Sequence, residues 1–284
     1  MKRVRVGTID IGGGAPLAVI AGPCVVESRD LVFRTAETLA ESTRRLGVPL
    51  VFKSSYKKAN RTSITSFTGI GRDEALTILS DIRSAFGIPV VTDIHEVGEA
   101  SAAAQAVDML QIPAFLCRQT ELLIAAGMTG RPVNIKKGQF MAPADMRHAA
   151  EKIASTGNVS ILLCERGTCF GYHDLVVDMR SLVILRSIGY PVVMDATHAV
   201  QIPAAGSVSG GRPEFIFPIA RAAAAIGIDA LFIETHPDPP SALSDAASQL
   251  PLGQFPLLLE EVLAVDRAVR SMPPFPSASG ETLG

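Results

Sequence analysis

A short basic segment directly follows the apolar run at residues 48–52. It reads FKSSYKKANRTS and carries Lys53, Lys57, Lys58 and Arg61 among hydroxyl and amide side chains. Ammonium and guanidinium groups bind phosphates and carboxylates through charge-assisted hydrogen bonds. The segment therefore predicts a receptor for a small anion, with a solvated basic loop as the alternative. In either case we expect Lys57 to remain in solvent.

Polar side chains also follow seven other short apolar runs. They are Cys24 with Glu27, Asp93 with His95, Gln111, Lys136 with Lys137, Glu165 with Arg166, Asp195 with His198, and Glu234 with His236. Several cations at one place predict a substrate set with several negative charges. Thiolate, imidazole and carboxylate groups together favour a divalent transition metal over magnesium.

Each of these residues also has a purely structural interpretation. Cys24 could be a small buried apolar residue, and His198 could be a loop histidine bonded to a backbone carbonyl. Asp93 and Asp195 could cap the helices that follow them. A lysine at an inward-pointing strand end, as at Lys136 and Lys137, needs an anionic partner, so these two are harder to explain by structure alone.

The apolar runs alternate with helical patterns in a regular order. Gly-x-Pro turns at residues 47–49, 87–89 and 189–191 each end a helical pattern and precede a strand-like run. The runs are continuous, as in parallel strands buried on both faces. They span residues 17–21, 50–52, 90–92, 109–112, 133–135, 161–164, 192–194 and 230–233.

Eight such units over about 250 residues predict an α/β fold of the (β/α)8 TIM barrel type, whose active sites form at the carboxyl ends of the strands. An open doubly wound sheet is the alternative, but no GxGxxG follows the first strand. We expect a single domain over residues 1–272, with an N-terminal β-hairpin at residues 1–14 that plugs the bottom of the barrel. Residues 273–284 are expected to form a flexible tail.

Composition narrows the possible partners and the cellular location. The formal net charge of −2 gives no overall attraction for nucleic acid or an anionic membrane. No apolar run approaches the roughly 20 residues of a membrane span. The four cysteines form no CxxC pair, and the N-terminus lacks the apolar core of a signal peptide, so we expect a cytoplasmic protein.

Motifs at every strand end resemble those of the 3-deoxy-D-manno-octulosonate 8-phosphate synthase family. They are IAGPCVVES, FKSSYKKANRTS, TDIHE, LQIPAFLCRQT, NIKKGQF, LCERGTCFGY, DATHAVQ and ETHPDPPSALSDAASQLPL. The resemblance implies a barrel enzyme, usually a homotetramer. It condenses phosphoenolpyruvate with D-arabinose 5-phosphate and water, giving the octulosonate phosphate and inorganic phosphate. Its product serves lipopolysaccharide synthesis, which implies a bacterial cytoplasm.

The resemblance also implies roles for individual residues. The residues expected to bind phosphoenolpyruvate are Lys58, Gln111, Ala114, Lys136 and Arg166. Those expected to bind the pentose phosphate are Lys53, Ser55, Asn60, Arg61 and Ser63. Arg118 is expected to reach the pentose phosphate of a neighbouring subunit. Catalytic roles are expected for His198, Lys58, Lys136, Asp93 and Asp245.

The family divides into metal-dependent members with Cys in the GPC position and metal-independent members with Asn there. This chain resembles the metal-dependent class, which implies a divalent ion (Mn, Zn, Co or Fe) bound by Cys24, His198, Glu234 and Asp245.

Two other functions remain open. One is 3-deoxy-D-arabino-heptulosonate 7-phosphate synthase, which typically has KPRT or KPRS where this chain has KANRTS. The other is a non-catalytic barrel that binds sugar phosphates. The glycine-rich residues 204–212 are either a lid or a plain loop.

Overall fold

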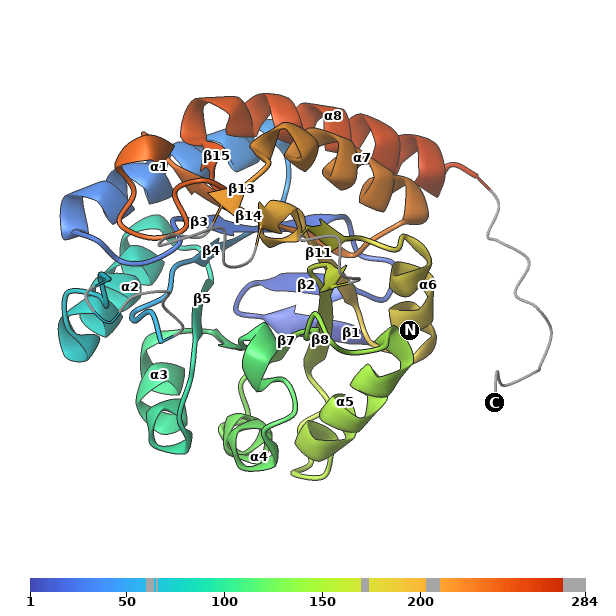
Figure 1. The fold of residues 1–284 in the computed structure, drawn as a ribbon, viewed down its shortest axis with the longest axis horizontal. Coiled ribbons are helices and arrows are strands. Elements are labelled where there is room, and N and C mark those ends of the chain that lie inside the picture. The colour runs from blue at the N-terminus through green and yellow to red at the C-terminus, as the bar shows by residue number, and fades with distance from the viewer. Residues whose placement is uncertain (60–63, 65, 170–173, 203–209, 273–284) are drawn as a thin grey trace.

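Eight parallel strands form a closed barrel in the computed structural model, which describes residues 1–59, 64, 66–169, 174–202 and 210–272 (Figure 1). The strands are β3 (Ala18–Gly22), β4 (Leu50–Lys53), β5 (Val90–Asp93), β6 (Met109–Ile112), β7 (Val133–Lys136), β8 (Ile161–Glu165), β11 (Val192–Asp195) and β14 (Ala230–His236). Each pairs with the next along the chain, and β14 pairs with both β11 and β3, which closes the sheet. The prediction of a (β/α)8 barrel is confirmed.

One α-helix follows each barrel strand and packs on the outside of the sheet. These helices are α1 (Arg29–Leu46), α2 (Arg72–Phe86), α3 (Ala100–Ala106), α4 (Thr120–Met128), α5 (Met146–Ala154), α6 (Arg180–Ser187), α7 (Ile216–Ile226) and α8 (Phe255–Arg270). The Gly-x-Pro prediction holds, since Gly47 and Gly87 end α1 and α2 with φ of 69° and 65°. That left-handed conformation is readily available to glycine.

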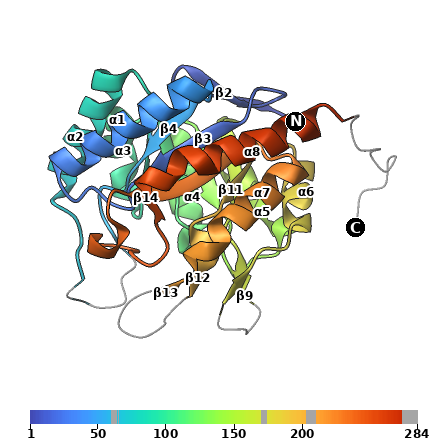
Figure 2. The same ribbon diagram turned by 90° about the horizontal axis from the view of Figure 1, so that it is seen from above.

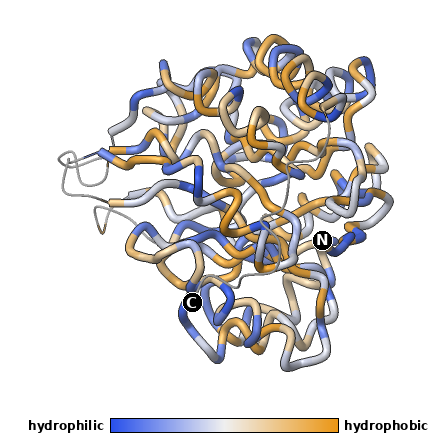
Figure 3. Tube along the Cα trace, turned by 90° about the vertical axis from the view of Figure 1, so that its right-hand side faces the viewer, coloured by the Kyte–Doolittle hydropathy of each residue, from blue (hydrophilic) through white to orange (hydrophobic). Residues whose placement is uncertain are grey.

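The main core lies between the strands and the helices. All residues of β4, β5, β6 and β7 are buried, as expected for strands covered on both faces. On α2 the buried residues include Ala75, Leu79 and Ile82, which recur at helical spacing. Figure 3 shows the corresponding alternation of hydrophobic and hydrophilic positions along the outer helices.

The N-terminal hairpin closes one end of the barrel. It consists of β1 (Arg3–Val6) and β2 (Ile9–Gly12), paired antiparallel. Its buried residues Val4, Val6 and Ile11 join the apolar cluster of the barrel interior. The backbone N–H of Lys2 donates to the carbonyl of Gly189, which lies just before β11, at 3.0 Å. The hairpin thus plugs the amino ends of the strands and leaves their carboxyl ends as the open mouth.

Short strands and 3-10 turns lie in the connections that follow the barrel strands. Two small antiparallel pairs, β9 (Thr168–Cys169) with β10 (Leu175–Val176) and β12 (Gln201–Ile202) with β13 (Gly210–Gly211), follow β8 and β11. Figure 2 shows β9, β12 and β13 on the same side of the molecule. β15 (Leu250–Pro251) pairs in parallel with the last two residues of β14. The 3-10 turns are η1 (Val97–Glu99), η2 (Ala114–Leu116), η3 (Pro143–Asp145), η4 (His198–Val200), η5 (Pro213–Phe215), η6 (Pro239–Ser241) and η7 (Leu252–Gln254).

Two predicted features lie wholly or largely outside the described residues. These are the tail at residues 273–284 and most of the glycine-rich segment, of which Gly210, Gly211 and Arg212 alone are described. Within the part of the chain that the structure describes, no helix is both long and apolar enough to cross a membrane.

Candidate active site

The predicted site residues gather at the carboxyl ends of the barrel strands. Those that the structure places around the mouth are Cys24, Lys53, Ser55, Lys58, Asp93, Gln111, Ala114, Lys136, Arg166, His198, Glu234 and Asp245. Asn60, Arg61 and Ser63 lie outside the described residues. Arg118 follows η2 and is exposed to solvent.

Three candidate metal ligands converge in a group at the junction of β14 and β3. One ligand atom from each of Cys24, Glu234 and Asp245 lies within 4.8 Å of the other two. The pairing of β14 with β3 aligns Glu234 with Gly22, two residues before Cys24. The thiol of Cys24 donates to Oδ2 of Asp245 at 3.0 Å. The fourth predicted ligand is adjacent, with Nε2 of His198 3.5 Å from Oε1 of Glu234.

The electrostatics of this group suit a cation. Burial raises the pKa of the Cys24 thiol well above its usual value, and the carboxylates of Asp245 and Glu234 raise it further. A divalent ion would compensate these negative charges, and the donor set of sulfur, oxygen and nitrogen is one that zinc and its neighbours accept. The residues present therefore fit a transition metal. The backbone of Asp245 is unusual, because its φ of 50° is the sole positive value for a residue other than glycine in the described chain.

Asp195 links Lys136 to His198 beside the metal ligands. Its Oδ2 lies 2.7 Å from Nζ of Lys136 and 2.7 Å from Nδ1 of His198. Burial would raise the pKa of Asp195, but His198 and Lys136 together lower it well below its usual range. Nζ of Lys136 also lies 3.9 Å from the ring centroid of Phe232, a cation–π distance.

A chain of buried polar side chains crosses from β4 to β7. Asp93 accepts hydrogen bonds from the hydroxyl of Ser55 and from the amide of Gln111. Asn134 donates in turn to Oε1 of Gln111 at 2.8 Å. Burial would raise the pKa of Asp93, but Lys53, Lys136 and other nearby cations hold it below its usual range. Asp93 is thus an ionised acceptor inside the mouth.

Lys53 is buried and the Lys58 side chain is 12% exposed, so a solvated basic loop does not describe these two cations. Lys53 is 1% exposed; its ammonium pairs with Glu234 and donates to the carbonyl of Cys24 at 2.9 Å. Nζ of Lys58 lies 3.5 Å from Oδ2 of Asp245. Lys57 was expected to remain in solvent, and its side chain is 33% exposed. Its ammonium binds Glu99 at 2.7 Å, because Glu99 faces the loop from the next strand unit.

Arg166 offers hydrogen-bond donors that other described residues do not use. Its Nη2 donates to Oε1 of Gln201 at 2.8 Å, while its buried Nε and Nη1 have no hydrogen-bond partner among the described residues. Buried donors are normally satisfied. These two nitrogens therefore point to an anionic ligand such as a carboxylate or phosphate.

His198 and Asp195 make contacts beyond those expected of purely structural residues. Among the described residues, the His198 side chain bonds the carboxylate of Asp195 and not a backbone carbonyl. Asp195 does cap η4, since its Oδ1 accepts the backbone N–H of His198 at 2.9 Å. Its other oxygen contacts Nζ of Lys136 and Nδ1 of His198, so capping accounts for only part of its contacts.

Lys137 and Glu165 form a supporting pair behind Arg166. Nζ of Lys137 is fully buried and lies 3.4 Å from Oε1 of Glu165, the anionic partner that the sequence required. The same oxygen accepts the backbone N–H groups of Arg166 and Gly167, so the pair shapes the turn that presents Arg166. The sequence did not point to Gln249, which contacts Cys24 from 225 positions away. No local pattern signals a contact at such a separation.

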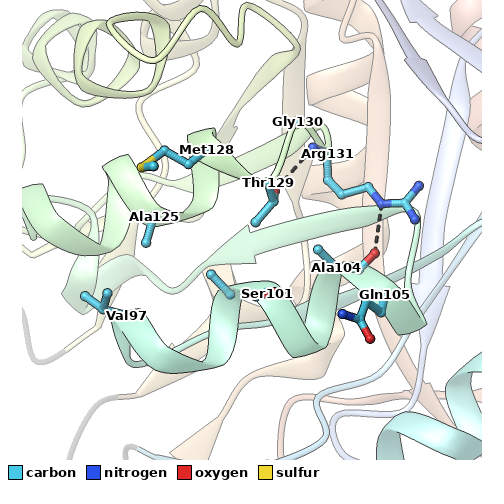
Figure 4. Close-up of a pocket in the computed structure, with 10 residues that line it drawn as sticks. Val97, Ser101, Ala104, Gln105, Ala125, Met128, Thr129, Gly130 and Arg131 are labelled. Atoms are coloured by element: carbon cyan, nitrogen blue, oxygen red, sulfur yellow. Dashed lines mark hydrogen bonds between the residues drawn. The ribbon is translucent and has the colours of Figure 1, made fainter.

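A separate groove lies on the outer wall between α3 and α4 (Figure 4). Its volume is about 660 Å³, and apolar or small residues such as Val97, Ala104 and Met128 line much of it. Arg131 reaches into it but donates its Nε to the carbonyl of Ala104 at 2.9 Å. None of the predicted site residues lines this groove.

The chain is similar to known proteins over nearly its whole length. Residues 2–270 match the model of the DAHP synthetase I family. The 2-dehydro-3-deoxyphosphooctonate aldolase of Trichlorobacter lovleyi is 54% identical over 270 residues, covering 95% of this chain and 99% of that protein. The protein of the same name from Syntrophotalea carbinolica is 54% identical, covering 94% and 97%. That from Brucella ovis is 52% identical, covering 95% and 98%.

Proposed function

The chain belongs to the DAHP synthetase I family, and on that premise we propose that it condenses phosphoenolpyruvate with D-arabinose 5-phosphate and water. The products are 3-deoxy-D-manno-octulosonate 8-phosphate and inorganic phosphate, which makes the protein a transferase that supplies lipopolysaccharide synthesis. The observation that carries this function is the identity of 54% to 2-dehydro-3-deoxyphosphooctonate aldolase over 95% of the chain. Heptulosonate synthesis from erythrose 4-phosphate is not favoured, because these relatives are named 2-dehydro-3-deoxyphosphooctonate aldolase, after an eight-carbon product.

Phosphoenolpyruvate carries a carboxylate and a phosphate, and the cations of the mouth suit both. We assign its binding to Lys58, Gln111, Ala114, Lys136 and Arg166. The free Nε and Nη1 of Arg166 support this assignment, since they have no hydrogen-bond partner among the described residues. We assign the pentose phosphate to Lys53, Ser55, Asn60, Arg61 and Ser63.

The proposed metal site consists of Cys24, His198, Glu234 and Asp245. Sulfur, nitrogen and oxygen donors within one buried group support Mn, Zn, Co or Fe as the ion. When bound, such an ion supplies Lewis acidity and orientation to an oxygen of the aldehyde or of the attacking water. The protein's own part is to hold four ligands on three different segments, at the ends of β3, β11 and β14.

The reaction forms one carbon–carbon bond and one carbon–oxygen bond, and it breaks the carbon–oxygen bond to the phosphate. C3 of phosphoenolpyruvate bonds to the aldehyde carbon of the pentose, whose oxygen takes up a proton. The oxygen of water bonds to C2 and loses a proton. Collapse at C2 then breaks the bond to the phosphate oxygen, the C2 hydroxyl gives its remaining proton to the departing phosphate, and C2 becomes a carbonyl. Two protons must therefore be moved within the site.

Asp195 orients His198, which we propose both as a metal ligand and as a catalytic residue. The hydrogen bond from Nδ1 of His198 to Asp195 fixes the tautomer and orientation of the imidazole, so Nε2 is the atom that faces the metal ligands. Lys136, held by the same carboxylate, places positive charge beside the substrate phosphate. Asp93, with its pKa held low, orients Ser55 and Gln111 toward the substrates.

We also propose a cytoplasmic homotetramer in which Arg118 acts across a subunit interface. Arg118 and Phe115, three positions earlier, are both exposed, which supports this placement because aromatic and arginine side chains are enriched at subunit interfaces.

Product identification tests the proposed reaction. The purified protein is incubated with phosphoenolpyruvate, arabinose 5-phosphate and Mn²⁺, and the products are analysed by mass spectrometry and ³¹P NMR. An eight-carbon keto acid phosphate and one equivalent of inorganic phosphate are expected. A protein that binds both substrates but releases no phosphate would instead be the non-catalytic sugar-phosphate binder.

A further inference from the structure

The buried amide of Gln249 joins the two chain segments that carry Cys24 and Asp245. Gln249 is 2% exposed. Its Oε1 accepts the backbone N–H of Cys24 at 3.3 Å, and its Nε2 donates to the backbone carbonyl of Ser244 at 2.9 Å. Ser244 directly precedes Asp245, so a single side chain bridges the backbones at two of the proposed metal ligands.

The two partners require an amide at this position. The backbone N–H of Cys24 can only donate and the carbonyl of Ser244 can only accept, so the bridging group must offer one acceptor and one donor. A carboxylate offers two acceptors, and asparagine is shorter by one methylene. An apolar side chain would leave both backbone groups buried without these partners, which is costly.

Gln249 is itself anchored to the barrel sheet. The next residue, Leu250, begins β15 and pairs with Thr235 of β14, whose hydroxyl donates to the carbonyl of Leu250 at 2.8 Å. The loop that Gln249 holds is less regular, since Asp245 has a positive φ of 50°. Such a conformation persists when surrounding contacts determine it. The amide therefore connects a rigid strand to a strained ligand-bearing loop.

We propose that Gln249 is a positioning residue for the metal site. It sets the distance between the Cys24 and Asp245 segments so that the thiol and the carboxylate, 3.0 Å apart, close on the same ion. This inference rests on the proposed metal-dependent function. Residues that orient metal ligands typically contribute between about 10-fold and 100-fold to metal affinity.

The test compares the wild type with Gln249→Met, which keeps the approximate volume and removes both hydrogen bonds. Affinity for Zn²⁺ is measured by equilibrium dialysis, and the Co²⁺-loaded protein is examined for the thiolate-to-cobalt charge-transfer band. We expect affinity to fall about 10-fold to 100-fold and the band to weaken or shift. Gln249→Glu keeps the shape of the side chain but loses the donor to the carbonyl of Ser244, so it is expected to change both readouts in the same direction. It serves as the test variant if Gln249→Met fails to fold.

Asn158→Leu is the matched control. The amide of Asn158 also bridges backbone groups, donating to the carbonyls of Gly127 and Arg131, but it precedes β8 at the opposite end of the barrel. It should lower thermal stability and leave both metal readouts unchanged. Wild-type affinity and spectrum in both Gln249 variants would overturn the positioning role alone. Absence of metal binding by the wild type would overturn the metal site as well.

Discussion

Nζ of Lys136 lies 2.7 Å from Oδ2 of Asp195, and both side chains are buried at the mouth of the barrel. Burial would lower the pKa of Lys136, but Asp195 and the other nearby negative groups raise it, so its ammonium stays charged. The pair is shared with His198, whose Nδ1 contacts the same oxygen. In the proposed reaction, this pair would present a substrate phosphate with a fixed positive charge that needs no reorganisation.

The first prediction concerns that charge. Lys136→Met should lower kcat by about 10²-fold to 10³-fold, the usual effect of removing one group that stabilises developing negative charge. Phosphate release at saturating substrates is the measurement, with circular dichroism to verify folding. Lys2→Met serves as the control, because Lys2 contacts Tyr190 near the hairpin, at the opposite end of the barrel. A Lys136→Met enzyme within threefold of wild type would remove Lys136 from the proposed mechanism.

Metal removal gives the second prediction. Dialysis against a strong chelator, verified by elemental analysis, should abolish phosphate release, and adding back Mn²⁺, Zn²⁺, Co²⁺ or Fe²⁺ should restore it. The physical reason is that the proposed ion supplies the Lewis acidity and orientation that the reaction uses. Full activity in the verified metal-free protein would contradict the proposed metal dependence.

Cys24→Asn refines that experiment, since the resemblance implies that metal-independent relatives carry Asn at this position. We expect weaker metal binding in this variant because one anionic sulfur ligand is lost. Activity should not become metal-independent, because Glu234 and Asp245 still face each other in the remaining cluster. Metal titration of activity, compared with Cys169→Ser as an exposed-cysteine control, measures both effects.

The third prediction tests the role of Arg118 across the interface. Arg118→Ala should raise the KM for arabinose 5-phosphate and leave the KM for phosphoenolpyruvate nearly unchanged. Mixing Arg118→Ala subunits with Lys136→Met subunits should restore part of the activity, because some sites then combine an intact Lys136 with an Arg118 from the neighbour. No gain on mixing, in a sample shown by native mass spectrometry to contain hybrid oligomers, would place Arg118 outside the neighbouring site.

The fourth prediction concerns the pH dependence of stability. Burial would raise the pKa of Glu99, but hydrogen bonds from Lys57 and from the backbone N–H groups of His95 and Glu96 contribute to lowering it to about 2. A carboxyl group whose pKa is lowered by folding stabilises the folded state when the pH lies above the ordinary pKa of that group. This stabilisation is lost as the pH falls toward the folded-state pKa of about 2. The free energy of unfolding should therefore drop more steeply between pH 5 and about pH 3 in the wild type than in Glu99→Gln.

Urea unfolding at several pH values measures this difference. Glu96→Gln is the control, because the Glu96 side chain is mostly exposed and its ion pair with Lys57 is longer, at 3.4 Å. Parallel curves for the wild type and Glu99→Gln would show that the Glu99 interactions do not contribute to the acid sensitivity of the fold.

Most of the fold could be predicted from the sequence because its signals are local. Continuous apolar runs and Gly-x-Pro turns indicated eight parallel strands, and the strands begin and end within three residues of those predictions. Strand order then brings their ends together, which is why Cys24 and Glu234 could be expected to meet across β3 and β14. The hairpin was also expected, since residues 1–14 alternate in hydrophobicity.

The contacts that join distant segments could not be predicted in the same way. The amide of Gln249 bridges Cys24 and Ser244, and neither its spacing nor its residue type suggests this. The ion pair between Lys57 and Glu99, which lies on the next strand unit 42 positions away, could not be predicted either. Such pairings depend on loop paths between the strands and helices, whereas periodicity describes only the strands and helices themselves.

Choice of the sugar tests the central claim most directly. Initial rates of phosphate release from phosphoenolpyruvate are measured with arabinose 5-phosphate, with erythrose 4-phosphate and with no sugar, at the same metal concentration. The proposed function predicts rapid release with arabinose 5-phosphate, a much lower kcat/KM with erythrose 4-phosphate and almost none without sugar. Release with erythrose 4-phosphate alone would contradict it.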